Sequence, residues 1–197
     1  IPNSFLFYSM DSLKTYLKDN PEFPIITKLR NGSGSHNVKL IKNKNELLNH
    51  AKVMFHNGIS SSPSLFYKAK SNIKTSKSID TFIKRAKRIP EFLMTLAQSK
   101  HFPNEKGYVY LQKFIPNDGY DLKIVTVGNK LSFIGRNIRE GDFRASGGGD
   151  LFFDKSRVTK DMIDSAFKTS DLLGFKCMGY DYVVDNKTGK GIIIEIS

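Results

Sequence analysis

Two carboxylates near the end of the chain, Asp181 and Glu195, have the residue types and spacing that could bind a metal ion. The β-branched runs Tyr180–Val184 and Ile192–Ile196 flank a turn-rich segment, a pattern that predicts an antiparallel hairpin with the two carboxylates opposite each other. Because directly opposed like charges destabilise a sheet, we expect a cation between them. Carboxylate oxygens suit Mg²⁺. The alternative interpretation of the hairpin alone is a solvated outer face.

The same register makes two further predictions about the hairpin. It places Val183 opposite Ile193. It also directs Ser197, two residues beyond Glu195, to the carboxylate face, where the hydroxyl adds a weaker oxygen ligand. The predicted metal ligands are therefore Asp181, Glu195 and Ser197.

A glycine- and serine-rich segment after Lys28 could bind phosphate. The sequence predicts a strand over Phe23–Leu29 and a second strand over Val38–Ile41, separated by a flexible loop. The loop includes Gly32, Ser33, Gly34 and Ser35. Glycines let backbone N–H groups approach phosphate oxygens. The segment matches neither a Walker A motif nor the dinucleotide fingerprint, and an ordinary surface hairpin is the alternative.

Arginines gather around a second glycine-bearing loop, which the sequence places after a hairpin of Asp121–Val127 and Lys130–Arg136. Arg136, Arg139 and Arg144 belong to this group. A guanidinium group can contact phosphate or carboxylate through two parallel hydrogen bonds, and a solvated loop is again the alternative. A phosphate loop, an arginine loop and a carboxylate hairpin together favour an anionic ligand held through a metal.

Composition limits the class of protein. A chain of 197 residues is long enough for one large domain or two small ones. We see no signal peptide and no apolar run near the ~20 residues of a membrane span, and we expect a cytoplasmic protein. The single cysteine, Cys177, excludes internal disulfides and most zinc sites, and we expect it in the core. Residues 1–100 carry 17 Lys and Arg against 6 Asp and Glu, whereas residues 101–197 carry 14 against 13.

Two helical segments complete the prediction. Leu65–Arg88 is strongly basic and has a helical apolar stripe, so we expect a basic helical insertion. Thr159 can cap a helix that runs through Leu173 and ends at Gly174. Its inward side chains are predicted to be Met162, Ile163, Ala166, Phe167 and Leu173.

These motifs, in this order, resemble the ATP-grasp fold and, within it, most closely the ribosomal-protein glutamate ligases. The resemblance rests on Phe23–Ser35, Leu111–Pro116 with Asp121–Lys123, Arg136–Arg144, Gly179–Asp181 and Ile194–Ser197. It implies an α+β fold of two α/β subdomains whose antiparallel sheets grip ATP. Residues 1–107 would form the first, with the insertion at about 57–107, and residues 108–197 the second. An upstream domain and the C-terminal end of the family would be missing.

The resemblance also implies roles for single residues. Lys28 would contact ATP phosphates under a lid made by Gly32, Ser33, Gly34 and Ser35. Adenine would lie against the hinge Gln112, Lys113, Phe114 and Ile115, mainly through the backbone of Lys113 and Ile115, and Asp121 would hold the ribose. Arg144 would meet the phosphates or an acyl-phosphate, and Arg136 the transferring group. Asp181, Glu195 and Ser197 would hold Mg²⁺, with Mn²⁺ as a substitute.

The implied activity is that of a Mg²⁺-dependent carboxylate-amine ligase acting through an acyl-phosphate. From the positive charge we expect an acidic small-molecule, peptide or sugar acceptor. One alternative is a polyanion-binding module using residues 65–88, although sparse aromatics there argue against nucleic acid. The other is a catalytically degenerate scaffold, because Lys113 and Ser197 depart from the family pattern. A homo-oligomer remains open.

Overall fold

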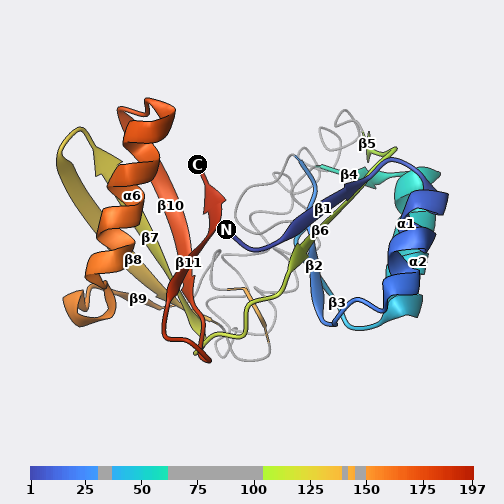
Figure 1. The fold of residues 1–197 in the computed structure, drawn as a ribbon, viewed down its shortest axis with the longest axis horizontal. Helices are drawn as coiled ribbons and strands as arrows, with labels where there is room; N and C mark the ends of the chain where they lie inside the picture. The colour runs from blue at the N-terminus through green and yellow to red at the C-terminus, as the bar shows by residue number, and fades with distance from the viewer. Residues whose placement is uncertain (31–36, 62–103, 139–141, 145–149) are drawn as a thin grey trace, which may run out of the picture. The chain divides into compact units, whose positions relative to one another are not determined.

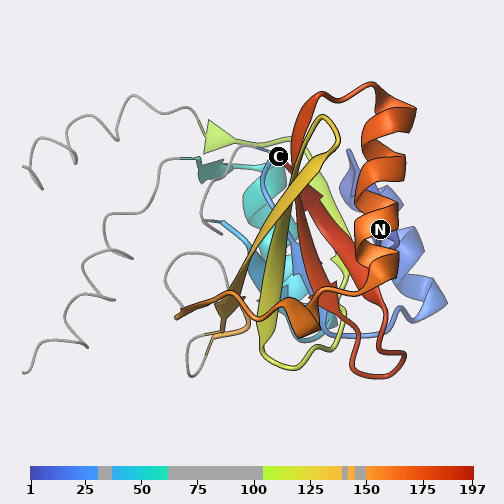
Figure 2. The same ribbon diagram turned by 90° about the vertical axis from the view of Figure 1, so that its left-hand side faces the viewer.

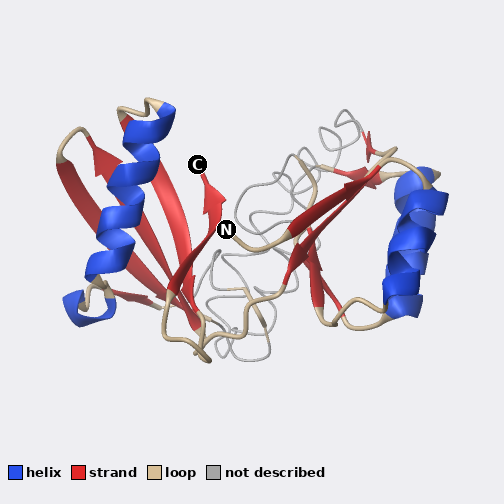
Figure 3. Cartoon of the chain, in the orientation of Figure 1, coloured by secondary structure: helices blue, strands red, loops and turns tan. Residues whose placement is uncertain are grey.

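A computed structural model describes residues 1–30, 37–61, 104–138, 142–144 and 150–197. The predicted phosphate loop, the basic stretch 65–88 and Arg139 lie outside the described residues. The described chain combines antiparallel sheets with a few helices, which confirms the predicted α+β class (Figure 3). In the part of the chain that was described, no helix is long and apolar enough to cross a membrane.

A five-stranded antiparallel sheet carries four of the predicted site residues, Asp121, Arg136, Asp181 and Glu195 (Figure 1). Its order is β11-β10-β7-β8-β9. The strands are β7 (Tyr120–Val127), β8 (Lys130–Asn137), β9 (Leu151–Phe152), β10 (Cys177–Val184) and β11 (Gly191–Ile196). The predicted hairpin over Gly128 is confirmed, because β7 and β8 pair from Val127 opposite Lys130.

Helix α6 (Lys160–Leu173) covers one face of this sheet, and a short 3-10 helix (Lys155–Arg157) precedes it (Figures 1 and 2). The predicted caps are confirmed. The Thr159 hydroxyl accepts from the Met162 N–H at 3.3 Å, and Gly174 ends the helix in a left-handed conformation with φ of +69°.

The buried stripe of α6 runs through Met162, Ala166 and Ser170, at i, i+4 and i+8. The prediction that Leu173 points inward is wrong, because its side chain is 52% exposed. Ser170 occupies the next buried position of the stripe and is accommodated there by hydrogen bonds. The remaining sheet-side core residues are Leu122, Ile124, Tyr180, Tyr182 and Ile193.

A β-bulge in β11 decides which residues of the final hairpin face the core. Asp181 lies opposite Glu195 as predicted, but the next pair is Tyr182 with Ile193, which skips Ile194. The prediction of Val183 opposite Ile193 is therefore wrong, since Val183 pairs with Ile192. One extra residue in one strand shifts the side-chain alternation by one position. The bulge lets Ile193 and Glu195 occupy opposite faces although they are two residues apart.

Cys177 begins β10 and is exposed, so the prediction of a core cysteine is wrong. It pairs with Val127, where β7 ends at the hairpin turn and where Val127 itself is 55% exposed. Alternation along β10 places the side chain of Cys177 on the same face as Asp181, which α6 does not cover, so an apolar residue type there is not buried.

A second sheet has the order β1-β6-β2-β3. Its strands are β1 (Ser4–Phe7), β2 (Ile25–Thr27), β3 (Lys39–Ile41) and β6 (Val109–Lys113). The accompanying helices are α1 (Met10–Tyr16), continued by a 3-10 helix (Leu17–Asp19), and α2 (Lys44–Phe55). A two-stranded sheet pairs β4 (Ile59–Ser60) with β5 (Asn104–Glu105).

Sequence periodicity explains the helices of this part. Asn43 caps α2 by accepting from the Glu46 N–H at 3.0 Å, and the buried positions Leu47, Ala51 and Met54 recur at helical spacing. The chain forms two compact units. One comprises 1–5, 23–26 and 112–197, and the other comprises 6–22 and 27–111.

Candidate functional site

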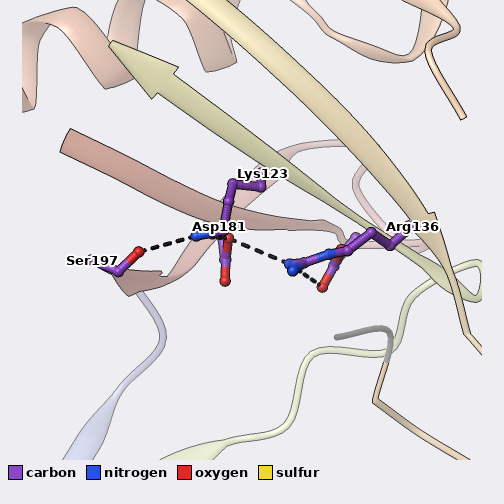
Figure 4. A network of polar contacts seen from close by, with 5 residues as sticks. Lys123, Arg136, Asp181 and Ser197 are labelled. Carbon is purple, nitrogen blue, oxygen red and sulfur yellow. Dashed lines mark hydrogen bonds and ion pairs between the residues drawn. The ribbon is translucent and has the colours of Figure 1, made fainter. Parts of the chain in front are cut away.

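A row of charged side chains crosses the face of the five-stranded sheet that α6 does not cover. Asp181 on the central strand β10 has Glu195 as its partner on β11 and Lys123 as its partner on β7. Nζ of Lys123 lies 2.8 Å from Oδ1 of Asp181 and donates to the Ser197 hydroxyl at 3.0 Å (Figure 4). A positive charge therefore does lie beside the opposed carboxylates, and the chain itself supplies it.

Arg136 on β8 links this row to Asp121, its cross-strand partner on β7. The guanidinium donates to both oxygens of Asp121, from Nε at 2.6 Å and from Nη2 at 2.8 Å. The same Nη2 lies 3.4 Å from Oδ1 of Asp181 (Figure 4). The Asp121 carboxylate is thus engaged by Arg136, while the roles of Asp121 toward ribose and of Arg136 toward the transferring group stay predictions.

Burial and charge act against each other at this pair. Burial raises the pKa of the Asp121 carboxyl, and the hydrogen bonds and charge of Arg136 reverse that rise only in part. Burial alone would lower the pKa of Arg136, but the hydrogen bonds to Asp121, the negative charges of Asp121 and Asp181 and a weaker polar contact with Asp181 together raise it. The guanidinium therefore stays charged and fixed.

One buried oxygen on this face lacks a hydrogen bond. Asp181 is 8% exposed, and its Oδ1 has two cations nearby, yet neither contact has hydrogen-bond geometry within the described residues. The short distances show electrostatic attraction, and the poor alignment of both donors leaves the hydrogen-bonding capacity of Oδ1 only partly used. A buried acceptor without a donor is costly, so such an atom is a candidate ligand atom.

Ser197 lies opposite Gly179, and the two residues exchange backbone hydrogen bonds of 2.7 and 2.9 Å. A Cβ at Gly179 would lie 3.2 Å from the Ser197 hydroxyl oxygen and 3.4 Å from Nζ of Lys123. Glycine at this position therefore leaves space for both groups. The Ser197 hydroxyl, predicted as a metal ligand, accepts a hydrogen bond from Lys123.

Two carboxylates on one face could supply part of the coordination shell of Mg²⁺, but not all of it. Glu195 is exposed, and none of the described residues forms an ion pair or hydrogen bond with its carboxylate. The described residues contain no cluster of three or more His, Cys, Asp or Glu side chains that could hold a metal. Mg²⁺ often takes one or two carboxylates and completes its shell with water and phosphate oxygens. Asp181 and Glu195 could hold it in that manner.

The predicted phosphate lysine belongs to the other unit. Strand β2 ends at Thr27, so Lys28 follows the strand directly instead of lying on it. Two residues later, the Arg30 N–H donates to Oε2 of Glu105 at 3.0 Å and to the Tyr108 hydroxyl at 2.7 Å. The Tyr108 hydroxyl also donates to Glu105, and burial followed by this hydrogen bond raises the pKa of Tyr108 to about 12. Glu105 and Tyr108 thus fix the backbone just before the predicted phosphate loop.

The hinge residues continue from strand β6. Gln112 is buried, and the Lys113 N–H donates to the carbonyl of Asn3 at 2.8 Å. The Ile115 carbonyl accepts from the Asn117 side chain at 3.1 Å. Phe114, between Lys113 and Ile115, is half-buried. The adenine contact assigned to this segment stays a prediction.

Arg144 pairs with Asp142, to which its side chain donates from Nε at 2.9 Å and from Nη2 at 2.8 Å. Burial lowers the pKa of this guanidinium. The structure thus brings together Asp121, Arg136, Asp181 and Ser197 and sets Glu195 opposite Asp181, while the role of Arg144 toward phosphate stays a prediction.

Sequence reasoning did not assign a site role to Lys123, Glu105 or Tyr108. A signal existed for Lys123, because a strand residue two positions after Asp121 shares its face. No local signal connects Glu105 with Arg30, which is 75 residues away in the sequence.

No protein-family model matches the chain, and no curated protein matches it. Solved structures are similar over the whole chain. Macrocyclase MdnC from Microcystis aeruginosa, bound with precursor peptide MdnA, has 13% identity and a TM-score of 0.53 over 47% of its own length. D-alanine–D-alanine ligase from Bacillus anthracis, complexed with ATP, has 14% identity and a TM-score of 0.55 over 48% of its length.

A third similar structure is a Chryseobacterium gregarium RiPP-associated ATP-grasp ligase in complex with ADP and a leader and core peptide. It has 12% identity and a TM-score of 0.53, covering 100% of this chain and 46% of that one. The chain thus spans about half the length of these proteins. At such identities the likeness establishes the fold, and the chain has the ATP-grasp fold, as its sequence predicted.

Proposed function

We propose that this chain is the Mg²⁺- and ATP-binding part of an ATP-grasp carboxylate-amine ligase. The observation that carries the proposal is the buried Oδ1 of Asp181, whose contacts with Lys123 and Arg136 lack hydrogen-bond alignment and which belongs to a carboxylate directly opposite Glu195. Structures with this fold include complexes with ATP and with Mg and ADP. The boundary near residue 107 and the closer likeness to ribosomal-protein glutamate ligases stay predictions.

In the proposed reaction a carboxylate oxygen attacks the γ-phosphorus of ATP, the bond to ADP breaks, and an acyl-phosphate forms. An amine then attacks the acyl carbon, phosphate leaves and the amine loses a proton. Bound Mg²⁺ would neutralise charge on the phosphate oxygens. Such chemistry depends on positioning and charge neutralisation more than on a general base.

The chain's own residues supply that positioning. Asp181 and Glu195 would hold the metal, and Lys28 with Arg144 would bind phosphate oxygens. Arg136 is held by two hydrogen bonds from its guanidinium to Asp121, so its charge is oriented without a substrate. Mn²⁺ would substitute for Mg²⁺ at a pair of carboxylates.

The acceptor is proposed to be an acidic small molecule, peptide or sugar, because of the net charge of +12. The similar structures include complexes with precursor peptides, which is compatible with a peptide acceptor. The polyanion-binding alternative depends on residues 65–88, which lie outside the described residues.

The test removes the two carboxylate charges one at a time. Asp181→Asn and Glu195→Gln should each weaken Mg²⁺–ATP binding about tenfold or more, measured by calorimetry, and reduce ATP consumption, because each removes one of two anionic ligands. Asp171→Asn is the matched control, since Asp171 is an exposed acid on α6. Undiminished Mg²⁺–ATP binding in both site variants would contradict the proposal.

A further inference from the structure

Lys123 occupies the position where the opposed carboxylates require a positive charge. We propose that it is the resident counter-ion of Asp181, and that its ammonium group must leave this carboxylate before Mg²⁺ can bind there. This inference rests on the proposed function. It makes Lys123 a residue that sets the metal affinity of the site, a role distinct from contacting substrate.

The contacts of Lys123 support a counter-ion role. Its Nζ is 2.8 Å from Oδ1 of Asp181, closer than any other cation in the described residues. The lysine side chain is 27% exposed and the aspartate side chain 12%, so solvent screens their attraction only in part. Without the ammonium group, the partly buried Asp181 would face Glu195 with no neutralising charge beside it except Arg136.

Of the two cations near Oδ1 of Asp181, Lys123 is the one that can leave. Arg136 is committed to Asp121 through two charge-assisted hydrogen bonds of 2.6 and 2.8 Å. Lys123 makes one hydrogen bond, to the neutral hydroxyl of Ser197. An ammonium group on a flexible stem also gives up a contact more easily than a planar guanidinium held at two points.

The surroundings of Nζ give it room. The position beside it, Gly179, has no side chain, and an added Cβ would lie 3.4 Å from Nζ. Metal and ammonium cannot share the same carboxylate oxygen without strong repulsion. Binding of Mg²⁺ at Asp181 therefore includes moving Lys123, and the site binds metal more weakly than its two carboxylates alone would.

Lys123→Met tests this inference because methionine keeps an unbranched apolar stem and removes the charge. In calorimetric titrations of MgCl₂ into the nucleotide-free 197-residue chain, we expect the variant to bind Mg²⁺ about tenfold more tightly than the wild type. Its thermal unfolding temperature without metal should fall, and added Mg²⁺ should raise that temperature more than in the wild type. Lys123→Gln serves as a second variant if methionine prevents folding.

Lys130→Met is the matched control, because it removes one exposed lysine at the other end of the β7–β8 hairpin. An Mg²⁺ affinity of Lys123→Met that is equal to or weaker than that of the control would overturn the inference. Failure of the wild type itself to bind Mg²⁺ would overturn the proposed function and the metal part of this inference together. A double-mutant cycle of Lys123→Met with Asp181→Asn in metal-free protein separates the two, since zero coupling there overturns the counter-ion role alone.

Discussion

The two faces of the five-stranded sheet are built from alternate residues of the same strands, yet they differ in whether their buried polar atoms are hydrogen-bonded. On the face covered by α6, Tyr180 and Tyr182 are fully buried and both hydroxyls are hydrogen-bonded, to Ser170 at 2.6 Å and to Ser165 at 2.7 Å. On the other face, the buried Oδ1 of Asp181 has no hydrogen bond within the described residues.

This difference separates a structural face from a functional one. Neutral hydroxyls can satisfy one another's hydrogen-bonding capacity inside a core. A core whose polar atoms are all hydrogen-bonded has none left to bind a ligand. Charged groups that are paired but not fully hydrogen-bonded retain attraction for a further ion or anion. Replacing a residue of the charged face should therefore change binding, with or without a change in stability, whereas replacing a polar residue of the α6 face should change stability alone.

The largest expected effect on stability comes from the charged face, through the loss of Arg136. Arg136→Met leaves the buried Asp121 carboxylate unpaired and should lower the free energy of unfolding by about 3–5 kcal/mol at pH 7, measured by urea denaturation. Burial already raises the pKa of Asp121. The raised pKa means that the folded variant binds a proton at a pH where the unfolded chain does not. Stability should therefore recover as the pH falls toward the folded pKa.

Arg157→Met is the control for that measurement. Arg157 is an exposed arginine of the same unit whose guanidinium lies over the rings of Tyr120 and Phe152, at 4.7 and 4.6 Å. Its loss should cost about 1 kcal/mol, without the recovery at low pH. Equal destabilisation by the two variants would show that the Arg136–Asp121 pair is no more than a surface contact.

A second prediction concerns a neutral buried hydrogen-bonded pair in the other unit, His50 with Thr27, and its effect on stability. His50 is buried, and its Nε2 lies 3.1 Å from the hydroxyl of Thr27. Burial, with a smaller effect of the charge on Lys39, lowers the pKa of His50 to about 4. The unfolded chain therefore binds more protons than the folded one between pH ~6.5 and about 4. Stability should fall by about 3 kcal/mol across this window as the pH decreases, measured by urea denaturation.

His50→Gln should flatten this pH dependence, because glutamine can still contact Thr27 but does not titrate there. His56→Gln, at the exposed end of α2, should leave the dependence unchanged. If His56→Gln flattens the pH profile and His50→Gln does not, the proton is taken up by His56, and the prediction for His50 is contradicted.

The sequence was sufficient to predict the architecture of the five-stranded sheet and the opposed carboxylates of its site. Alternation and turn residues predicted the β7–β8 hairpin, the capped helix α6 and the pairing of Asp181 with Glu195, because these signals are local. The bulge at Ile194 was not predicted, since no residue type there forces an extra position and only the packing of Ile193 against the core shows it.

Non-local contacts account for the other misses. Lys123 reaches Asp181 across a strand pair that joins residues 58 positions apart, so its charge could not be assigned to a carboxylate from spacing alone. The burial of Cys177 was predicted from residue type, but strand alternation places it on the face of Asp181, which α6 does not cover. Leu173 was also predicted from residue type, and its helical phase places it beyond the stripe of Met162, Ala166 and Ser170.

The smallest expected effect comes from the face covered by α6, where a hydroxyl can be removed without touching the charged face. The hydroxyl of Tyr180 ends a chain of hydrogen bonds in which Ser170 also contacts Thr126 at 2.8 Å. Tyr180→Phe removes one end and leaves the Ser170–Thr126 bond intact, so the free energy of unfolding should fall by about 1 kcal/mol. Because Tyr180 and Asp181 are adjacent but face opposite sides of the sheet, Mg²⁺ affinity measured by calorimetry should not change. A change in metal affinity as large as that of Lys123→Met would mean that the two faces are coupled through the strand, and that the separation of stability from binding does not hold.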